Sequence, residues 1–261
     1  MLSLVVTTSR NPDALAAHEA EQWAARLGVR AVRRGGRSMA ALCREESVVG
    51  ALVISSARPP TYLSADGSLS YFYHPGMALT RIKQIAKGLG DPMVKAMELQ
   101  EGDRVLDCTL GRAADAIVAS HVVGPSGKVV GLESSPLLAE LTIHGLRTYS
   151  PPNRAVEAAM RAIEAHRAEH LSFLAACPDD AFDVVFFDPL FAEPVAASSA
   201  MQPLRPLADH RPLSLEAVAE ARRVATRSVV VKERPRSPLW ETLSVRRFVG
   251  GKGSSVVYGV L

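Results

Sequence analysis

The chain has 261 residues, of which 48% are hydrophobic and 22% are charged, and its formal net charge at pH 7 is +3. This composition predicts a globular protein with a substantial core, built as one large domain or as a domain with a smaller appendage. Three widely spaced cysteines and the lack of an apolar run of about 18 residues argue against a disulfide framework, a zinc site, a membrane span and a membrane partner, and we expect a cytoplasmic protein.

Residues 1–75 are expected to form a small α/β subdomain. The predicted strands are 4–7, 29–32 and 48–54, the predicted helices are 12–27 and 38–45, and a hairpin is predicted for 61–63 with 69–73. Asn11 is expected to cap the first helix, because its side chain can accept a backbone N–H there and Pro12 suits the first helical position.

Residues 76–261 are expected to form a second domain in which helices and strands alternate as in βαβ units. The predicted helices are 77–87, 92–99, 114–121, 136–147, 154–161, 171–176 and 214–225, the predicted strands are 105–107, 128–133, 162–166, 184–188 and 228–232, and a closing pair is 245–249 with 255–260. This order predicts a doubly wound, mostly parallel sheet with an antiparallel C-terminal strand. Residues 192–212 lack periodicity and are expected to form a loop over the active site.

Acidic residues lie at the ends of four predicted strands of this sheet. Asp107 ends the first of these strands, Glu133 the second and Asp188 the fourth, and Glu169 lies just past the end of the third. Ligands of doubly wound sheets bind outside the carboxyl ends of the strands. Glu133 is suited to accept hydrogen bonds from a ribose diol, and Glu169 to accept one from an adenine amino group. S-adenosylmethionine (SAM) carries both groups and is the cofactor that this pattern favours.

The segment 103–115 reads as a buried strand that stops at Asp107 and turns through Thr109 and Gly111 into a helix. It is typical of a nucleotide-type cofactor loop, although an ordinary turn between strand and helix also explains it. A full Gly-x-Gly-x-x-Gly is missing because Arg112, Ala113 and Ala114 follow. SAM has no phosphate and tolerates a less open loop than a dinucleotide does.

The motif Asp188-Pro189-Leu190-Phe191 indicates chemistry on an amine. The exocyclic amine of a nucleic-acid base is a poor nucleophile because its lone pair is delocalised into the ring. An enzyme must therefore hold this amine in line with the methyl group on the sulfonium of SAM. Asp188 and the backbone around Pro189 are candidates to accept the hydrogens of the amine, and Phe191 is a candidate to stack on the base. A strand-ending turn with a core phenylalanine is the alternative explanation.

Positive charge is concentrated in two segments. Five arginines and no acid lie within 26–37, and ten Lys or Arg against four acids lie within 211–261. Such segments can neutralise the phosphates of an RNA backbone, and solvated charges on an ordinary surface are the alternative. The same two explanations apply to four single cations, Arg81, Lys83, Lys232 and Arg234.

Over almost its whole length the sequence resembles the small-subunit (16S) rRNA guanine-N2 methyltransferase J family of class I SAM-dependent methyltransferases. The matching residues are 105–111 with 115–116, 131–133, 188–191 and 225–232. The resemblance implies a Rossmann-like class I methyltransferase fold, SAM as cofactor and small-subunit ribosomal RNA as partner. The cofactor contacts that it implies are Asp115, Glu133 with Ser134, Glu169 with His170, and Asp188. Ala113 stands where the family typically has a second glycine.

These observations favour a SAM-dependent methyltransferase that modifies the 2-amino group of a guanine in ribosomal RNA by direct displacement, without a metal ion. Transfer to tRNA, DNA or a small molecule is an alternative, as is a non-catalytic RNA-binding protein that kept the fold. A nicotinamide oxidoreductase would also place Glu133 on a ribose, but the missing glycines and the motif at Asp188 disfavour it.

Overall fold

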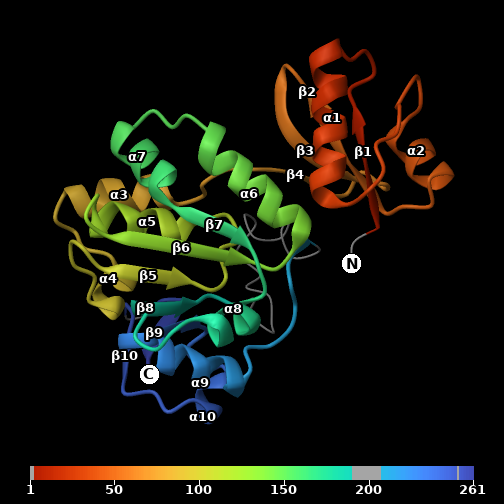
Figure 1. Ribbon diagram of the computed structural model, residues 1–261. Coiled ribbons are helices and arrows are strands. Elements are labelled where there is room, and N and C mark those ends of the chain that lie inside the picture. The colour runs from red at the N-terminus through yellow and green to blue at the C-terminus, as the bar shows by residue number, and fades with distance from the viewer. Residues whose placement is uncertain (1–2, 190–206, 252) are drawn as a thin grey trace. The chain divides into compact units, whose positions relative to one another are not determined.

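The computed structural model describes residues 3–189, 207–251 and 253–261, which divide into two compact units (Figure 1). The first unit contains the described residues up to His74 together with Leu207, and the second contains the other described residues from Pro75 to Leu261. Within the described ranges, no helix has the length and apolar character needed to cross a membrane.

The first unit is a four-stranded sheet with helices packed against it. Its strands, in sheet order, are β1 (Leu4–Thr8), β2 (Gly50–Ser55), β3 (Arg58–Ser64) and β4 (Ser70–Phe72). Strands β1 and β2 are parallel, whereas β3 and β4 continue the sheet in antiparallel fashion. Helices α1 (Ala14–Leu27) and α2 (Met39–Glu45) pack on β1 and β2, where Trp23, Leu42 and Ala51 are buried.

Two predictions for this unit are wrong. Asn11 does not cap the first helix, because Asp13 is the N-cap and its Oδ1 accepts a hydrogen bond of 2.8 Å from the N–H of Ala16. The predicted strand at 29–32 is reduced to a single parallel bridge between Ala31 and Val6. Periodicity favoured a strand there, but only this one residue pairs with β1 before the chain turns away through Gly35, at φ 58°.

The second unit contains the predicted doubly wound sheet. Its strands are β5 (Arg104–Asp107), β6 (Lys128–Glu133), β7 (Glu164–Arg167), β8 (Phe182–Phe187), β9 (Ala225–Glu233), β10 (Arg247–Val249) and β11 (Val257–Val260). They lie in the order β10-β11-β9-β8-β5-β6-β7. Strands β5 to β9 are parallel, and β11 is antiparallel to both β9 and β10. The predicted doubly wound, mostly parallel sheet with an antiparallel C-terminal strand is therefore confirmed.

Helices cover both faces of this sheet. They are α3 (Ala78–Ala86), α4 (Pro92–Met97), α5 (Ala114–Val123), α6 (Pro136–Thr148), α7 (Arg154–Ala162), α8 (His170–Ala176), α9 (Leu215–Val224) and α10 (Leu239–Thr242). Figure 1 shows α5 and α6 on one side of the sheet and α8 and α9 on the other. Helix α5 is apolar nearly all round because it packs against the sheet as well as α3 and α7.

The order of the strands reverses at β5, which lies between β6 and β8. Ligands of such sheets bind beside this switch point, at the carboxyl ends of the strands. Asp107, the last residue of β5, pairs in register with Gly131 of β6 and Phe186 of β8. A Cβ atom at Gly131 would lie 2.4 Å from Cδ1 of Leu110, so glycine lets the loop after β5 pack directly on β6.

Candidate functional site

The loop that follows β5 is fixed by its backbone to the strands on both sides. The N–H of Cys108 donates to the carbonyl of Phe186 at 2.9 Å, and the N–H of Leu110 donates to the carbonyl of Leu132 at 2.8 Å. These bonds prolong the pairing of β5 with β8 and then with β6 beyond the end of the strand. The loop is therefore held at the switch point of the sheet.

Thr109 connects two of the predicted strand-end carboxylates. Its N–H donates to Oδ1 of Asp107 at 3.0 Å, and its Oγ1 accepts a hydrogen bond of 2.6 Å from the N–H of Asp188. The cofactor loop and the Asp-Pro motif are thus joined by a single side chain. The structure brings Asp107, Thr109 and Asp188 together, as their positions at neighbouring strand ends suggested.

The turn into α5 uses left-handed backbone at two positions. Gly111 has a φ of 51°, and Ala113, which precedes the helix, has a φ of 61°. Glycine adopts this region without strain, whereas for a residue with a Cβ it costs roughly 1 kcal/mol or more. The backbone at residue 113 therefore favours glycine, and this chain makes the turn there with alanine.

Glu133, at the end of β6, lies against this loop. Its Oε2 accepts a hydrogen bond of 3.0 Å from the N–H of Gly111, and its Oε1 accepts one of 2.8 Å from the N–H of Ser135. The residue is only 7% exposed, and burial raises the pKa of its carboxyl group. Each carboxylate oxygen has a second lone pair, so Glu133 can still accept bonds from a ligand such as a ribose diol.

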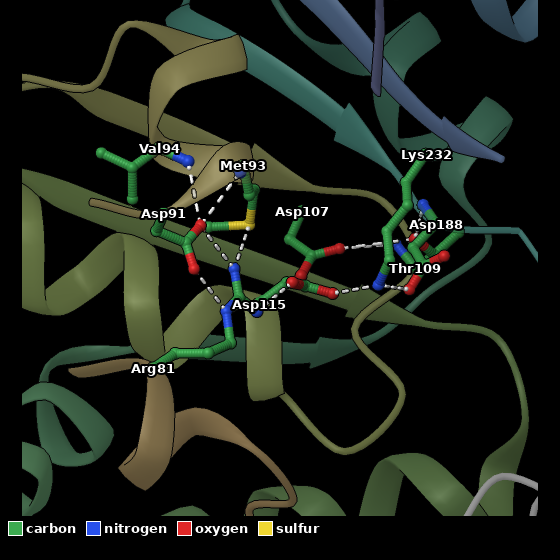
Figure 2. Close-up of polar contacts among 9 residues, drawn as sticks. All are labelled: Arg81, Asp91, Met93, Val94, Asp107, Thr109, Asp115, Asp188 and Lys232. Atoms are coloured by element: carbon green, nitrogen blue, oxygen red, sulfur yellow. Dashed lines mark hydrogen bonds and ion pairs between the residues drawn. The ribbon is translucent and has the colours of Figure 1, made fainter. Parts of the chain in front are cut away.

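A chain of alternating charges runs through the site (Figure 2). Lys232, on β9, places its Nζ 2.7 Å from Oδ2 of Asp188 and 3.1 Å from Oδ2 of Asp115, at the start of α5. Arg81, on α3, binds the other oxygen of Asp115 and forms a bidentate pair with Asp91 at 2.8 and 2.9 Å. These ion pairs connect α3, α5, β8 and β9.

The far end of this chain is fixed to the backbone. Oδ1 of Asp91 accepts hydrogen bonds from the N–H groups of Met93 and Val94 at 3.0 and 3.2 Å, which caps α4. Arg81 is therefore held by a carboxylate that cannot turn away without uncapping a helix. The side chains that form this chain of charges are mostly buried. The exposed fraction of the side chain is 16% for Arg81, 18% for Lys232 and 22% for Asp188.

Burial and charge set the protonation of these groups. Burial acts to raise the pKa of Asp115, but the charges of Lys232 and Arg81 outweigh it and hold this pKa well below its usual range. For Asp188, burial prevails over Lys232, and with the nearby Asp115 it raises the pKa to about 6. Burial raises the pKa of Asp107 to about 8.

Carboxyl groups outnumber cations here, although burial keeps that of Asp107 largely protonated at neutral pH. Asp91, Asp107, Asp115 and Asp188 face only Arg81 and Lys232 among the described residues. A positively charged ligand would relieve this imbalance, and the sulfonium of SAM is such a group. Among the residues that the structure describes, no group of His, Cys, Asp or Glu has an arrangement suited to a metal ion.

The remaining predicted cofactor residues lie beside this centre, at the ends of β6 and β7. Glu169 caps α8, since its oxygens accept bonds of 3.1 and 2.9 Å from the N–H groups of Leu171 and Ser172. Burial acts to raise the pKa of Glu169, but those amides lower it overall. The ring of His170 packs edge-on against that of Phe187, with 5.6 Å between the ring centroids. Burial lowers the pKa of His170.

Ser134 donates a hydrogen bond of 2.9 Å from its Oγ to Oδ2 of Asp209. Pro189 follows Asp188 and is half-buried. Phe191, which was predicted to stack on the base, and most of the predicted loop at 192–212 lie outside the described residues. The contacts of Glu169, His170, Ser134 and Phe191 with a ligand thus remain predictions.

Two residues expected at an RNA surface belong to the buried site instead. Lys232 and Arg81 were candidates for phosphate contacts, but both are engaged by the carboxylates of the charge chain. A signal for Lys232 was present in the sequence, because a lysine that ends a strand next to one ending in Asp188 lies at the same edge of the sheet. For Arg81 and Asp91 no comparable signal exists, since neither follows a strand.

Comparisons with known proteins agree with this geometry. The family described as "Putative SAM-dependent methyltransferase" matches residues 65–252. The "Uncharacterized protein YpiP" of Bacillus subtilis is 36% identical over 237 residues, which is 91% of each chain. The "Ribosomal RNA small subunit methyltransferase J" of Laribacter hongkongensis is 30% identical over 168 residues, which cover 62% of this chain and 57% of that relative.

A solved structure has a similar fold. The crystal structure of a SAM-dependent methyltransferase from Neisseria gonorrhoeae superposes with a TM-score of 0.63 and covers 98% of this chain and 94% of its own. The two sequences are 15% identical, so the likeness concerns the fold alone.

Proposed function

The chain belongs to the family of SAM-dependent methyltransferases, and from this premise we propose that it methylates the 2-amino group of a guanine in small-subunit ribosomal RNA. It is an enzyme, and SAM is its cofactor. The observation that carries the choice of an amine as acceptor is the position of Asp188 and Pro189, at the end of β8 and bound through Thr109 to the cofactor loop.

The choice of RNA is supported by the relative from Laribacter hongkongensis, whose name specifies a ribosomal RNA of the small subunit. Its similarity to this chain extends over 168 residues. The name gives the class of acceptor but no base, so the guanine 2-amino group rests on the resemblance of the residues at 188–191 to the methyltransferase J family.

The residues at the switch point fit SAM in charge and in hydrogen-bonding capacity. Glu133 would accept bonds from the ribose diol, because both of its oxygens are held in place by backbone amides and keep lone pairs. Asp107 and Asp115 would face the positive charge of the cofactor. The loop from Thr109 to Gly111 would pass close to it. When bound, the cofactor supplies the methyl group and keeps the electron pair of the broken C–S bond on its sulfur.

On the acceptor side, Asp188 would orient the amine by accepting one of its N–H groups. The nitrogen lone pair forms the new C–N bond, and the nitrogen then gives up a proton. A carboxylate whose pKa is about 6 is largely ionised at neutral pH and is basic enough to receive that proton. Lys232 holds Oδ2 of Asp188, so the other oxygen would be the one that binds the acceptor.

The proposal is tested with an unmodified transcript of small-subunit ribosomal RNA and SAM labelled in its methyl group. After transfer, the RNA is digested to nucleosides and separated by mass spectrometry. We expect label in N2-methylguanosine, and about 10²-fold less or lower with the Asp188→Asn variant. Label in another nucleoside would contradict the assignment of guanine as the target base. Transfer only to tRNA, DNA or a small molecule would contradict the assignment of small-subunit ribosomal RNA as the substrate.

A further inference from the structure

We infer that the first unit carries a binding edge for RNA phosphates, formed by Arg10, Arg33, Arg34 and Arg58. These four residues are called the arginine edge below. The inference rests on the proposed function in one respect, since it takes RNA as the partner. It concerns the first unit alone and names the surface on which the RNA backbone would be held.

The topology of the sheet gathers the arginine edge. Strands β1 and β2 are parallel, so their carboxyl ends lie at the same edge, and Arg10 follows the end of β1 by two residues. Arg58 begins β3 and pairs with Ser55, the last residue of β2. Arg33 and Arg34 follow Val32, whose N–H donates to the carbonyl of Val6 at 2.8 Å as the chain runs parallel to β1.

The side chains of the arginine edge are accessible and lack acidic partners among the described residues. Arg10, Arg33 and Arg58 are exposed and Arg34 is half-buried. None of the four forms an ion pair with a carboxylate in the part of the chain that the structure describes. Arg34 and Arg10 lie close enough to repel one another, and this repulsion adds to burial in lowering the pKa of Arg34.

The other arginines of the predicted basic segment at 26–37 are engaged by other groups of the protein, and Arg37 also donates to the carbonyl oxygens of Arg33 and Arg34. Arg30 pairs with Glu46 at 2.8 Å, and Arg37 pairs with Glu45 at 2.8 Å. Arg26 lies over the ring of Trp23, with 4.2 Å between its Cζ and the ring centroid. The segment therefore does not form one continuous basic patch, and its uncompensated charge is found at the arginine edge.

An acid also lies at this edge. Asp13 follows β1, and its Oδ1 accepts bonds of 2.8 Å from the N–H of Ala16 and from Oγ of Ser56. Glu45, beside the edge, is paired with Arg37, so Asp13 offsets one of the four charges of the arginine edge and three are left uncompensated among the described residues. Guanidinium groups bind phosphate oxygens in bidentate fashion, and several of them at one edge can hold successive phosphates of a backbone.

The experiment compares two triple variants that remove the same charge. The first is Arg10→Gln/Arg33→Gln/Arg58→Gln at the arginine edge. The second is Arg26→Gln/Arg30→Gln/Arg44→Gln, which leaves the bonds of Arg37 to the carbonyl oxygens of Arg33 and Arg34 in place. Fluorescence anisotropy measures the affinity of each for an unmodified small-subunit ribosomal RNA transcript between low and physiological salt. Circular dichroism melting and calorimetry with SAM verify that both variants fold and bind cofactor as the unsubstituted protein does.

We expect the edge variant to bind RNA at least about tenfold more weakly. The slope of log affinity against log salt should become shallower by about 0.7 to 0.9 for each phosphate that the variant no longer neutralises. The control variant should change much less. Equal losses in the two variants, no loss at the edge, or no RNA binding by the unsubstituted protein would each overturn the inference. Binding to phosphatidylserine vesicles in place of RNA would do so as well.

The outcomes also separate this inference from the proposed function. If N2-methylguanosine forms but the edge variant keeps full RNA affinity, the arginine edge is wrong and the proposed function stands. If the edge variant loses RNA affinity but the unsubstituted protein forms no N2-methylguanosine, the acceptor is wrong and the arginine edge stands.

Discussion

Lys232 and Asp188 lie side by side at the carboxyl ends of β9 and β8, and their side chains form an ion pair of 2.7 Å. The same Nζ binds Asp115 at 3.1 Å, at the start of the helix that follows the cofactor loop. One cation therefore connects the motif that would hold the acceptor with the loop that would hold the cofactor. This arrangement leads to predictions for both sides of the site.

Replacing Asp188 should separate catalysis from cofactor binding. In Asp188→Asn the amide cannot take up the proton of the amine, so we expect methyl transfer to fall by about 10²-fold or more. The affinity for SAM should stay within about threefold, because Glu133 and the loop after β5 are untouched. Transfer assays and calorimetry measure the two quantities. Full transfer by this variant would exclude the proposed role of Asp188.

Replacing Lys232 should shift the pH dependence of transfer. The charge of Lys232 lowers the pKa of Asp188 against the effect of burial, and the net pKa is about 6. Activity that needs the ionised carboxylate should thus rise through pH 6 in the unsubstituted protein. In Lys232→Met the pKa rises further and the rising limb moves to higher pH, whereas Lys232→Arg should restore much of the original profile. An unshifted limb in Lys232→Met would contradict the assignment of this limb to Asp188.

The substitution Lys232→Met should also destabilise the fold. Removing one partner of a buried ion pair leaves its carboxylates uncompensated, which typically costs about 3–5 kcal/mol. The exposed Lys83→Met on α3 is a matched control and should change the free energy of unfolding by less than about 0.5 kcal/mol. Denaturant titration measures both, and equal effects would contradict the structural role of Lys232.

Binding of SAM should release a proton from Asp107. The pKa of this buried carboxyl is about 8, so it is largely protonated at pH 7. A positive charge placed beside it favours the ionised form, and we expect the release of up to about one proton per SAM and an affinity that rises with pH toward 8. Calorimetry in buffers of different ionisation enthalpy measures the release. Asp107→Asn should abolish it, and an unchanged release in that variant would assign the proton to another group.

Replacing Glu133 should chiefly weaken the binding of SAM. Glu133→Ala removes the acceptor for the N–H groups of Gly111 and Ser135 and, as proposed, for the ribose diol. We expect a loss of SAM affinity of about tenfold or more, equal to about 1.4 kcal/mol. Glu164→Ala, an acid on β7 that pairs with Lys128 at 2.8 Å, is the matched control and should bind SAM normally. Equal SAM affinities of the unsubstituted protein, Glu133→Ala and Glu164→Ala would contradict the proposed contact of Glu133 with the cofactor.

Much of the fold and the gathering of the strand-end acids could be predicted because the signals were local. Apolar strands that end in Asp107, Glu133 and Asp188 are visible in sequence, and a parallel sheet necessarily brings the carboxyl ends of neighbouring strands to one edge. A local signal also misled. Asn11 and Pro12 favoured an earlier start of the first helix, whereas Asp13 is the N-cap and also accepts a hydrogen bond from Oγ of Ser56, which lies 43 positions away in the sequence.

The sequence by itself determined the class of fold, the cofactor and the acids at the strand ends. Only the tertiary structure decided the electrostatics of the site, because burial depth and strand order are not local properties. Lys232 meets Asp188 since β9 is the neighbour of β8, and Arg81 reaches Asp115 since α3 packs on α5. The same reason explains the arginines of the first unit: sequence proximity grouped those at 26–37, whereas ion pairs and the edge of the sheet separated them.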